Sequence, residues 1–328
     1  MASGTVGGVA TLLGRIDAWQ QRRRVTAFLV ATFVRYREDR GRQYGALLSY
    51  YGFVSLFPLL LVFATVLGIV LQDDAALRAR ILDTVYGRIP VVGAQLREST
   101  SGLDANGWAL ALGLVVSVYA GLAVVKHSQD ALNLQWSLPW YRRPRFVERN
   151  ARALGALVVV GLGIVLATAA TSVAAFLPAL DGGGRYLGAF VAVVVNIAVL
   201  TVGFRVLVKG GVDWRALVPG SVIGGVTLWL LQLVGAEYVS RVVLDASEVY
   251  GTFAVMFGLL AWIALLARVI LLANEVNVVR ARRLWPRSLL DAGPPGEGDR
   301  RAAEESRRRD LLFAEADAIA DAGARAGA

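Results

Sequence analysis

The sequence predicts an all-α, polytopic membrane protein with six transmembrane helices. Three observations support this prediction: 56% of the 328 residues are hydrophobic, the apolar residues gather in six long uncharged windows, and basic residues concentrate in alternate loops between these windows. Soluble domains contain about 45–50% apolar residues, and the mean hydropathy here is +0.56. We therefore expect much of the apolar surface to face lipid.

Each of the six windows is long enough to cross a bilayer. A hydrocarbon core of about 30 Å requires about twenty apolar residues in a helix. The windows run between charged residues, in order Arg42 to Asp73, Asp104 to Lys126, Arg152 to Asp181, Arg185 to Arg205, Arg215 to Glu237 and Glu248 to Arg268. Six spans are the main structural prediction.

The distribution of basic residues predicts that both ends of the chain are cytoplasmic. Arginine is abundant in the N-terminal tail, after the second and fourth windows and after the sixth, whereas the other three loops carry fewer cations or are balanced by acids. Cytoplasmic loops retain Lys and Arg, and tryptophan favours the membrane interface. Tryptophans at the predicted cytoplasmic edges agree with this orientation: Trp136, Trp140, Trp214 and Trp285.

Three segments differ in composition. Residues 1–42 form an amphipathic N-terminal segment with apolar residues at helical spacing between arginines, and we expect an interfacial helix rather than a partner-binding helix. Residues 43–280 form the six-span membrane domain. Residues 281–328 form a cytoplasmic, charged tail with a Gly- and Pro-rich linker, which we expect to be mobile and partly disordered.

The composition argues against several classes of function. A net charge of +9 is explained by basic cytoplasmic loops beside anionic lipid, so we expect no nucleic-acid partner. The chain has no cysteine and a single histidine, His127, which argues against thiolate chemistry and a His-rich metal site. We expect no metal, no cofactor and no enzymatic activity. The expected partners are the bilayer itself and a small-molecule or lipid substrate of undefined identity.

Two charged residues lie in or beside the last predicted span. Arg268 and Glu275 are about two helical turns apart and point the same way. We favour an interpretation in which Arg268 extends to the interface. Glu275, with Asn274 and Asn277, is expected to face a polar site near the inner mouth, because ionisable groups at membrane depth are functional candidates.

Other spans contain features that favour packing or a pathway. Pro58 interrupts the first span, and we favour a static kink over a polar-lined path. Interhelical hydrogen bonding is the expected role of Asn196 and Gln232, with a pathway as the alternative. Gly220 and Gly224 form a GxxxG pattern, which predicts a close helix crossing. The candidates for a substrate path are Ser55, Pro58, Asn196, Gln232, Arg268, Asn274, Glu275 and Asn277.

Two segments form recognisable signatures. Residues 46–60 read ALLSYYGFVSLFPLL, and residues 250–253 read YGTF, followed by Trp262 and by LLANEVN at 271–277. These segments, with DALN at 130–133, resemble the signatures of the YihY/virulence factor BrkB family over roughly residues 37–283. The resemblance implies a small residue at position 274, where this chain has Asn274, and an apolar residue at position 268, where it has Arg268. The motif residues are Tyr50, Tyr51, Pro58, Asn133, Tyr250, Gly251, Trp262, Glu275 and Asn277.

The resemblance implies a six-span protein of the bacterial inner membrane. It implies a transporter or a lipid- or envelope-handling protein whose substrate is undefined. The alternative is a non-transporting scaffold for envelope or virulence-related partners, with the basic N-terminal segment and the tail as contact sites. Some family members carry the label ribonuclease BN, but this chain lacks the clustered metal ligands or paired acid–base groups that RNA hydrolysis requires.

Overall fold

The computed structural model describes residues 14–70, 107–139, 142–175, 183–238, 252–289 and 296–326, and these residues form helices and no strand. Long helices of 25 to 31 residues coincide with the predicted windows. They are α3 (Gly41–Val70), α6 (Gly107–Gln135), α7 (Phe146–Ala175), α8 (Gly183–Leu207), α9 (Trp214–Tyr238) and α11 (Thr252–Arg282). Each contains most of one uncharged window, and α6, α7 and α11 also extend into charged flanking residues.

Three of these helices are, among the described residues, long and apolar enough to cross a membrane. These spans are Tyr186–Leu207, Trp214–Gly235 and Met256–Arg282. Their outward side chains include Phe190, Leu233 and Phe257, which are 66%, 57% and 67% exposed. Such extensive apolar exposure is typical of a lipid-facing surface. The all-helical fold that the sequence predicts is confirmed for the described residues, and three of the six predicted spans have the length and hydropathy of a membrane-crossing helix.

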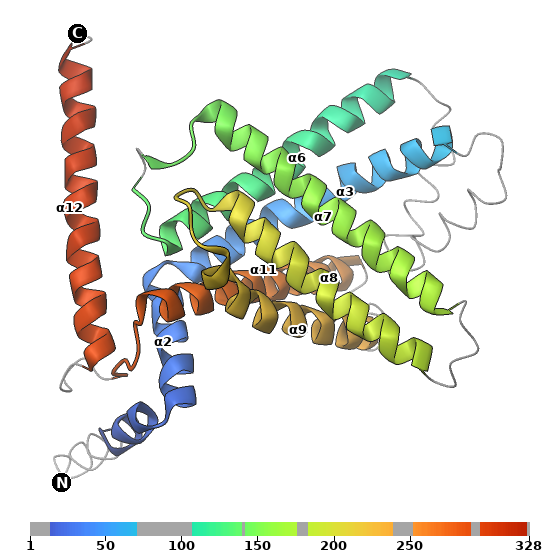
Figure 1. Ribbon diagram of the computed structural model, residues 1–328. Helices are drawn as coiled ribbons and strands as arrows, with labels where there is room; N and C mark the ends of the chain where they lie inside the picture. The colour runs from blue at the N-terminus through green and yellow to red at the C-terminus, as the bar shows by residue number, and fades with distance from the viewer. Residues whose placement is uncertain are drawn as a thin grey trace.

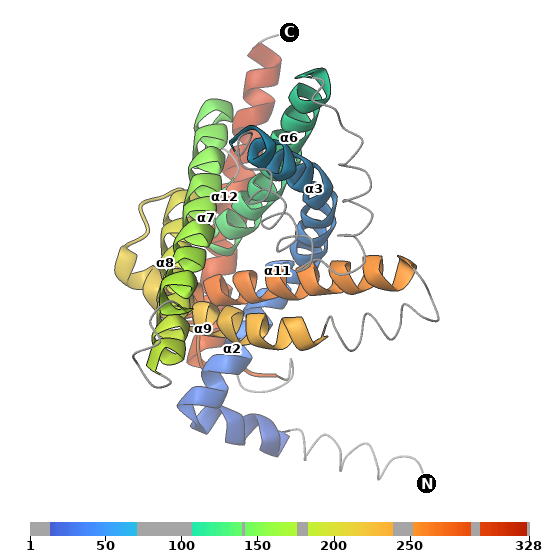
Figure 2. The ribbon, with the colours of Figure 1, turned by 90° about the vertical axis from the view of Figure 1, so that its right-hand side faces the viewer.

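The long helices pack in a ring that follows their order in the chain (Figures 1 and 2). Successive members contact each other from α3 through α6, α7, α8 and α9 to α11, and α11 packs back against α3. Small residues permit the closest of these crossings, because a Cβ added to Gly220 would overlap the Ala273 carbonyl and one on Gly224 would meet the Ala273 side chain. The predicted GxxxG crossing therefore joins α9 to α11.

The N-terminal segment docks against the ring. Helix α2 (Arg24–Glu38) follows helical turns at 14–22 and contacts α11 and α3. The docked face is buried and contains Ala31 and Arg35. The opposite face carries an exposed apolar stripe at four-residue spacing: Val25, Leu29 and Phe33. Helix α2 is thus amphipathic, as expected. One face packs against the protein, and the opposite face is suited to a membrane interface.

The C-terminal tail, which its composition predicts to be mobile and partly disordered, contains a long helix in the structure. Residues Glu297–Ala326 form helix α12, which lies near α2 at the end of the bundle where α6 ends and α7 begins (Figure 1). Asp299 anchors its first turn by accepting hydrogen bonds from the backbone N–H groups of Ser288 and Gly296, each at 2.9 Å. Two of its charged residues, Glu305 and Arg309, pair with residues of α2, of α11 and of the turn after α2.

Candidate functional site

The segments that the sequence predicts to be cytoplasmic meet at one end of the ring. The loop after α6, the loop after α8, the end of α11 and helix α12 line a common cavity there. Beneath it, every residue from 273 to 279 in α11 is buried. We define the inner polar cluster as the buried polar residues of α11 with their α6 neighbours: Gln135, Trp136, Asn274, Glu275 and Asn277.

Asn274 joins α11 to the end of α6 by hydrogen bonds from both polar atoms of its side-chain amide, Oδ1 and Nδ2. The Trp136 indole N–H donates to Asn274 Oδ1 at 3.2 Å, and Asn274 Nδ2 donates to Gln135 Oε1 at 2.6 Å. Gln135 Nε2 in turn donates to the Leu271 carbonyl at 3.1 Å. Buried polar groups require such partners. The resemblance to the family implies a small residue at position 274. The asparagine found there instead forms hydrogen bonds with Gln135 at the end of α6 and with Trp136 directly after it.

Asn277 satisfies a backbone donor in the neighbouring span. Pro219 lies inside α9, and proline interrupts the regular ladder of backbone hydrogen bonds. The N–H of the next residue, Gly220, donates to Asn277 Oδ1 at 2.6 Å. The position of Asn277 therefore supports the close crossing of α9 and α11 as well as completing the polar cluster.

Glu275 is the strongest functional candidate in the cluster. Its exposed fraction is 0%, and neither carboxylate oxygen has a hydrogen-bond partner among the described residues. The Gln135 amide is close to it but is directed at the Leu271 carbonyl. Burying an ionised carboxylate without a partner costs several kcal/mol. Glu275 is therefore suited to take up a proton, a cation or a donor group from a ligand.

A second unpartnered group, the Tyr36 hydroxyl, belongs to the same region. Its oxygen is buried without a hydrogen-bond partner in the described structure. Burial raises the pKa of Tyr36 above its ordinary value of 10.0, although Arg268 and Arg42 oppose this effect. The phenol therefore keeps its proton at neutral pH, and helix α2 presents it as a hydrogen-bond donor.

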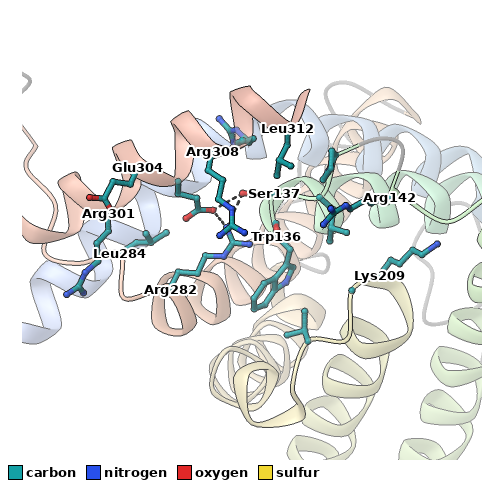
Figure 3. Close-up of a pocket in the computed structure, with 16 residues that line it drawn as sticks. Trp136, Ser137, Arg142, Lys209, Arg282, Leu284, Arg301, Glu304, Arg308 and Leu312 are labelled. Atoms are coloured by element: carbon teal, nitrogen blue, oxygen red, sulfur yellow. Dashed lines mark hydrogen bonds and ion pairs between the residues drawn. The ribbon is translucent and has the colours of Figure 1, made fainter. Parts of the chain in front are cut away.

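Buried ion pairs connect the tail to this region. The Arg35 side chain is 3% exposed and contacts Asp39 at 2.8 Å and Glu305 at 3.1 Å. Arg282, at the end of α11, also pairs with Glu305, and Arg309 reaches Asp39 at 3.0 Å. Figure 3 shows Arg282 beside Ser137, whose hydroxyl accepts from it at 3.1 Å. Helix α12 is thus fixed to both α2 and α11 by charges.

The structure separates the other substrate-path candidates. Asn196 Nδ2 donates to Gln232 Oε1 at 3.4 Å between α8 and α9, which fits the expected interhelical bond. The Ser55 hydroxyl donates to the Gly52 carbonyl of its own helix at 2.8 Å. Arg268 is exposed on α11. Of the candidates whose side chains the structure describes, Asn274, Glu275 and Asn277 lie in one cluster, while Ser55, Asn196 and Gln232 are engaged elsewhere.

Family-motif residues outside α11 mostly hold neighbouring elements together. The Tyr51 ring stacks on His127 with 4.4 Å between ring centroids. Asn133 Oδ1 accepts from the Lys209 backbone N–H at 2.9 Å and so fixes the loop after α8. Tyr50 is 59% exposed. Three motif residues give less information: the side chain of Pro58 and the whole of Tyr250 and Gly251 lie outside the described residues, although Pro58 falls within continuous helix α3.

Several residues that pair with one another at this end of the molecule were not predicted from the sequence. Arg35 and Asp39 have the four-residue spacing of an intrahelical ion pair, so that contact carries a local signal. Glu305 lies 270 residues from Arg35, and Gln135 lies 139 residues from Asn274. No spacing in the chain indicates pairs at such separations.

Comparisons with known proteins identify the family. A model of the virulence factor BrkB family matches residues 32–292. The inner membrane protein YhjD of Escherichia coli strain K12 is 27% identical over 161 residues, which are 47% of this chain and 48% of that relative. An uncharacterized protein of Dickeya dadantii strain 3937 is 26% identical over 42% of this chain and 43% of its own length. The chain therefore spans about half the length of these two relatives.

A third relative matches over a longer region. The UPF0761 membrane protein Smlt0865 of Stenotrophomonas maltophilia strain K279a is 26% identical over 279 residues, which cover 81% of this chain and 64% of that protein. No solved structure matches at a comparable level. The family match extends from α2 to beyond α11 and includes the inner polar cluster. The chain belongs to the virulence factor BrkB family of membrane proteins.

Proposed function

We propose that the chain crosses the inner membrane six times, with residues 1–42 and the tail in the cytoplasm. The coincidence of the long helices with the uncharged windows supports this threading. The meeting of alternate, arginine-rich loops at one end of the ring also supports it. Because the chain lacks cysteine, single-cysteine variants provide a direct test.

The test places one cysteine in each predicted compartment and measures labelling by a membrane-impermeant maleimide in intact cells. Glu248→Cys, which falls outside the described residues, is expected to react from outside, whereas Arg143→Cys is expected to react only after lysis. Equal reactivity of the two cysteines in intact cells would contradict the threading.

We infer that the protein is a transporter, or a lipid-handling protein of the envelope, in which Glu275 is the ionisable group on the substrate path. The observation that carries this proposal is a fully buried carboxylate whose two oxygens have no hydrogen-bond partner among the described residues, inside a helix long and apolar enough to cross a membrane. Such groups in spans are rare and usually functional. A group that serves only packing would be expected to have its hydrogen bonds satisfied, as those of Asn274 are.

Reconstituted vesicles test this function. One assay follows movement of fluorescent phosphatidylglycerol and phosphatidylethanolamine between leaflets, and the other follows internal pH with a trapped dye after an external pH step. Glu275→Gln is expected to lower the flux about tenfold or more without lowering the melting temperature, because a neutral amide is easier to bury than a carboxylate. Glu315→Gln, at an exposed position of α12, is the matched control.

Two results would contradict transport. In the first, wild-type protein moves neither lipid nor protons faster than protein-free vesicles. In the second, Glu275→Gln and Glu315→Gln transport equally well.

A scaffold is the second candidate, and one observation favours it. Ser55, Asn196 and Gln232 are used in local or pairwise helix contacts rather than in a shared path. The contact surfaces would then lie on the N-terminal segment and tail. Removal of residues 1–40 and 291–328 would abolish a scaffold function while the spans stay inserted, whereas vesicle flux that survives this truncation supports transport.

A further inference from the structure

The cavity at the inner end is strongly basic. It has a volume of about 770 Å³ and lies between α12 and the loops that follow α6 and α8 (Figure 3). This volume is in the range of pockets that hold small organic ligands. Two acidic side chains, Glu304 and Glu305, line it. The cationic side chains that line it are Arg142, Lys209, Arg282, Arg301, Arg308 and Arg309.

Existing ion pairs do not neutralise this charge. Glu305 is shared between Arg282 and Arg35, so one carboxylate serves two guanidinium groups. Lys209 contacts Glu148 at 2.7 Å, but Glu148 also pairs with Arg152 at 3.0 Å. Arg301 pairs with Glu297, and Arg309 pairs with Asp39, which also contacts Arg35. Because Glu305, Glu148 and Asp39 are each shared with a second cation, the walls of the cavity keep an excess of positive charge.

Arg308 is the cation most available to a ligand. It lines the cavity from α12, is exposed, and has no carboxylate partner among the described residues. Arginine presents a planar set of donors that matches phosphate and carboxylate oxygens in pairs. Glu305 already shows that oxygen anions fit this region, because its carboxylate contacts Arg282 and accepts from the Ser137 hydroxyl at 2.7 Å.

The cavity has an apolar side and lies at the level of the span ends. Trp136, Leu138 and Leu312 contribute apolar surface to its lining. The loop at 209–212 falls between the spans Tyr186–Leu207 and Trp214–Gly235. A bilayer places its phosphates at this depth, just outside the hydrocarbon core. The ligand chemistry that fits is a phosphate with an attached apolar or partly apolar group.

We propose that this cavity binds a phosphate-bearing anion, either the headgroup of an anionic lipid or a soluble organic phosphate, with Arg308 as a direct ligand. The site is distinct from Glu275, which does not line the cavity. The bound anion balances the excess positive charge and joins α12 to the loops after α6 and α8. This binding does not depend on transport, so the two proposals stand or fall separately.

The test uses the full-length protein in two arms. In detergent, calorimetry measures binding of pyrophosphate at an ionic strength held constant with sodium chloride. In nanodiscs of phosphatidylcholine with and without phosphatidylglycerol, mass spectrometry measures which lipid stays bound after extraction. Saturable pyrophosphate binding without lipid preference identifies a soluble ligand, and selective retention of phosphatidylglycerol identifies a lipid headgroup.

Variants of α12 locate the bound anion. Arg308→Gln is expected to weaken binding about tenfold, the effect of losing one charge-assisted hydrogen bond. Arg308→Lys keeps the charge and is expected to retain most of the affinity, and the exposed Arg307→Gln is the matched control with no expected change. The proposal is overturned if neither probe binds saturably, or if Arg308→Gln and Arg307→Gln bind as tightly as the wild type. These measurements require no flux, so an inactive but anion-binding protein contradicts only the transport proposal.

Discussion

The two halves of α11 lie in very different surroundings. The first half exposes large apolar side chains, including Phe253 and Phe257 at 69% and 67%, as a lipid-facing helix does. The second half is buried from 273 to 279 and places three polar side chains among partners from α6 and α9. In the first half, many different apolar residues could face lipid equally well. In the second, the Asn274 amide and Asn277 Oδ1 each depend on a particular neighbour, so substitutions of these residues have larger and more specific effects.

The largest effect is expected where α11 meets α9. Gly220→Ala would place a Cβ against the Ala273 carbonyl and the Asn277 amide, so the helices would have to separate. Overpacking of a tight contact costs about 1–3 kcal/mol, and displacement of backbone places this variant at the upper end. Thermal melting in detergent measures the loss.

Gly161→Ala provides the matched control for this prediction. No atom lies within 4 Å of the added Cβ, and alanine favours helix more than glycine. An equal fall in melting temperature for both variants would show that the crossing is not a tight contact.

Asn274→Leu is expected to cost about 2–3 kcal/mol. The substitution leaves the Trp136 indole N–H and Gln135 Oε1 buried without partners, and each unsatisfied group costs about 1–3 kcal/mol. Asn196→Leu breaks a longer, exposed hydrogen bond in the lipid-facing region and is expected to change the free energy of unfolding by less than about 1 kcal/mol. A smaller loss for Asn274→Leu than for Asn196→Leu would remove the distinction between the two regions.

Glu305→Ala is expected to release the tail without unfolding the ring. The variant removes the carboxylate shared by Arg35 and Arg282, and Arg35 has almost no access to water while α12 is docked. Breaking a buried pair in this way costs several kcal/mol. Undocking of α12 limits the net cost to about 1–2 kcal/mol, because Arg35 then becomes hydrated and keeps Asp39.

Limited trypsin digestion checks this prediction. Cleavage within residues 297–326 is expected to become faster, while the melting temperature of the spans stays close to that of the wild type. Glu315→Gln controls for loss of negative charge on the same helix. Unchanged protection of α12 would contradict a holding role for Glu305.

The smallest effect is expected at acid pH, where residues 14–22 of the N-terminal segment detach. Burial opposes ionisation of Asp17, but hydrogen bonds from the Leu289 backbone, Gln20, Ser288 and Gln21 outweigh it and lower the pKa below 3.8. A carboxylate with a depressed folded-state pKa stabilises the fold above its unfolded pKa, and this contribution is lost as pH falls through the folded value. We therefore expect residues 14–22 to detach from residues 287–289 only below about pH 3.8.

A nitroxide label at Ala18→Cys reports this change. Its mobility is expected to rise at acid pH in the wild-type background and to be high at all pH values with Asp17→Asn. Equal mobility of the two proteins at neutral pH would show that the Asp17 carboxylate does not hold the segment.

The sequence predicted the features that depend on local pattern. Uncharged windows located the helices, because lipid and helical hydrogen bonding act on continuous stretches of chain. The GxxxG spacing located the α9–α11 crossing. The inner polar cluster was predicted in part: Glu275 and its neighbouring asparagines were predicted to form a polar site. Trp136 was predicted only to lie at the membrane interface, and neither Gln135 nor the tail residue Glu305 was predicted to have a role. Their roles depend on contacts between distant segments, and the charged composition of the tail indicated mobility instead of docking.

The ion pairs of α2 impose an order on biosynthesis. Arg35 and Asp39 precede Glu305 and Arg309 by 270 residues each, so they are synthesised well before these partners. Until the segment with Glu305 and Arg309 is made, Arg35 and Asp39 pair with each other within α2. This end of the bundle is therefore completed after its long helices have been made, and a chain that stops before α12 leaves Arg35 and Arg282 without their shared carboxylate.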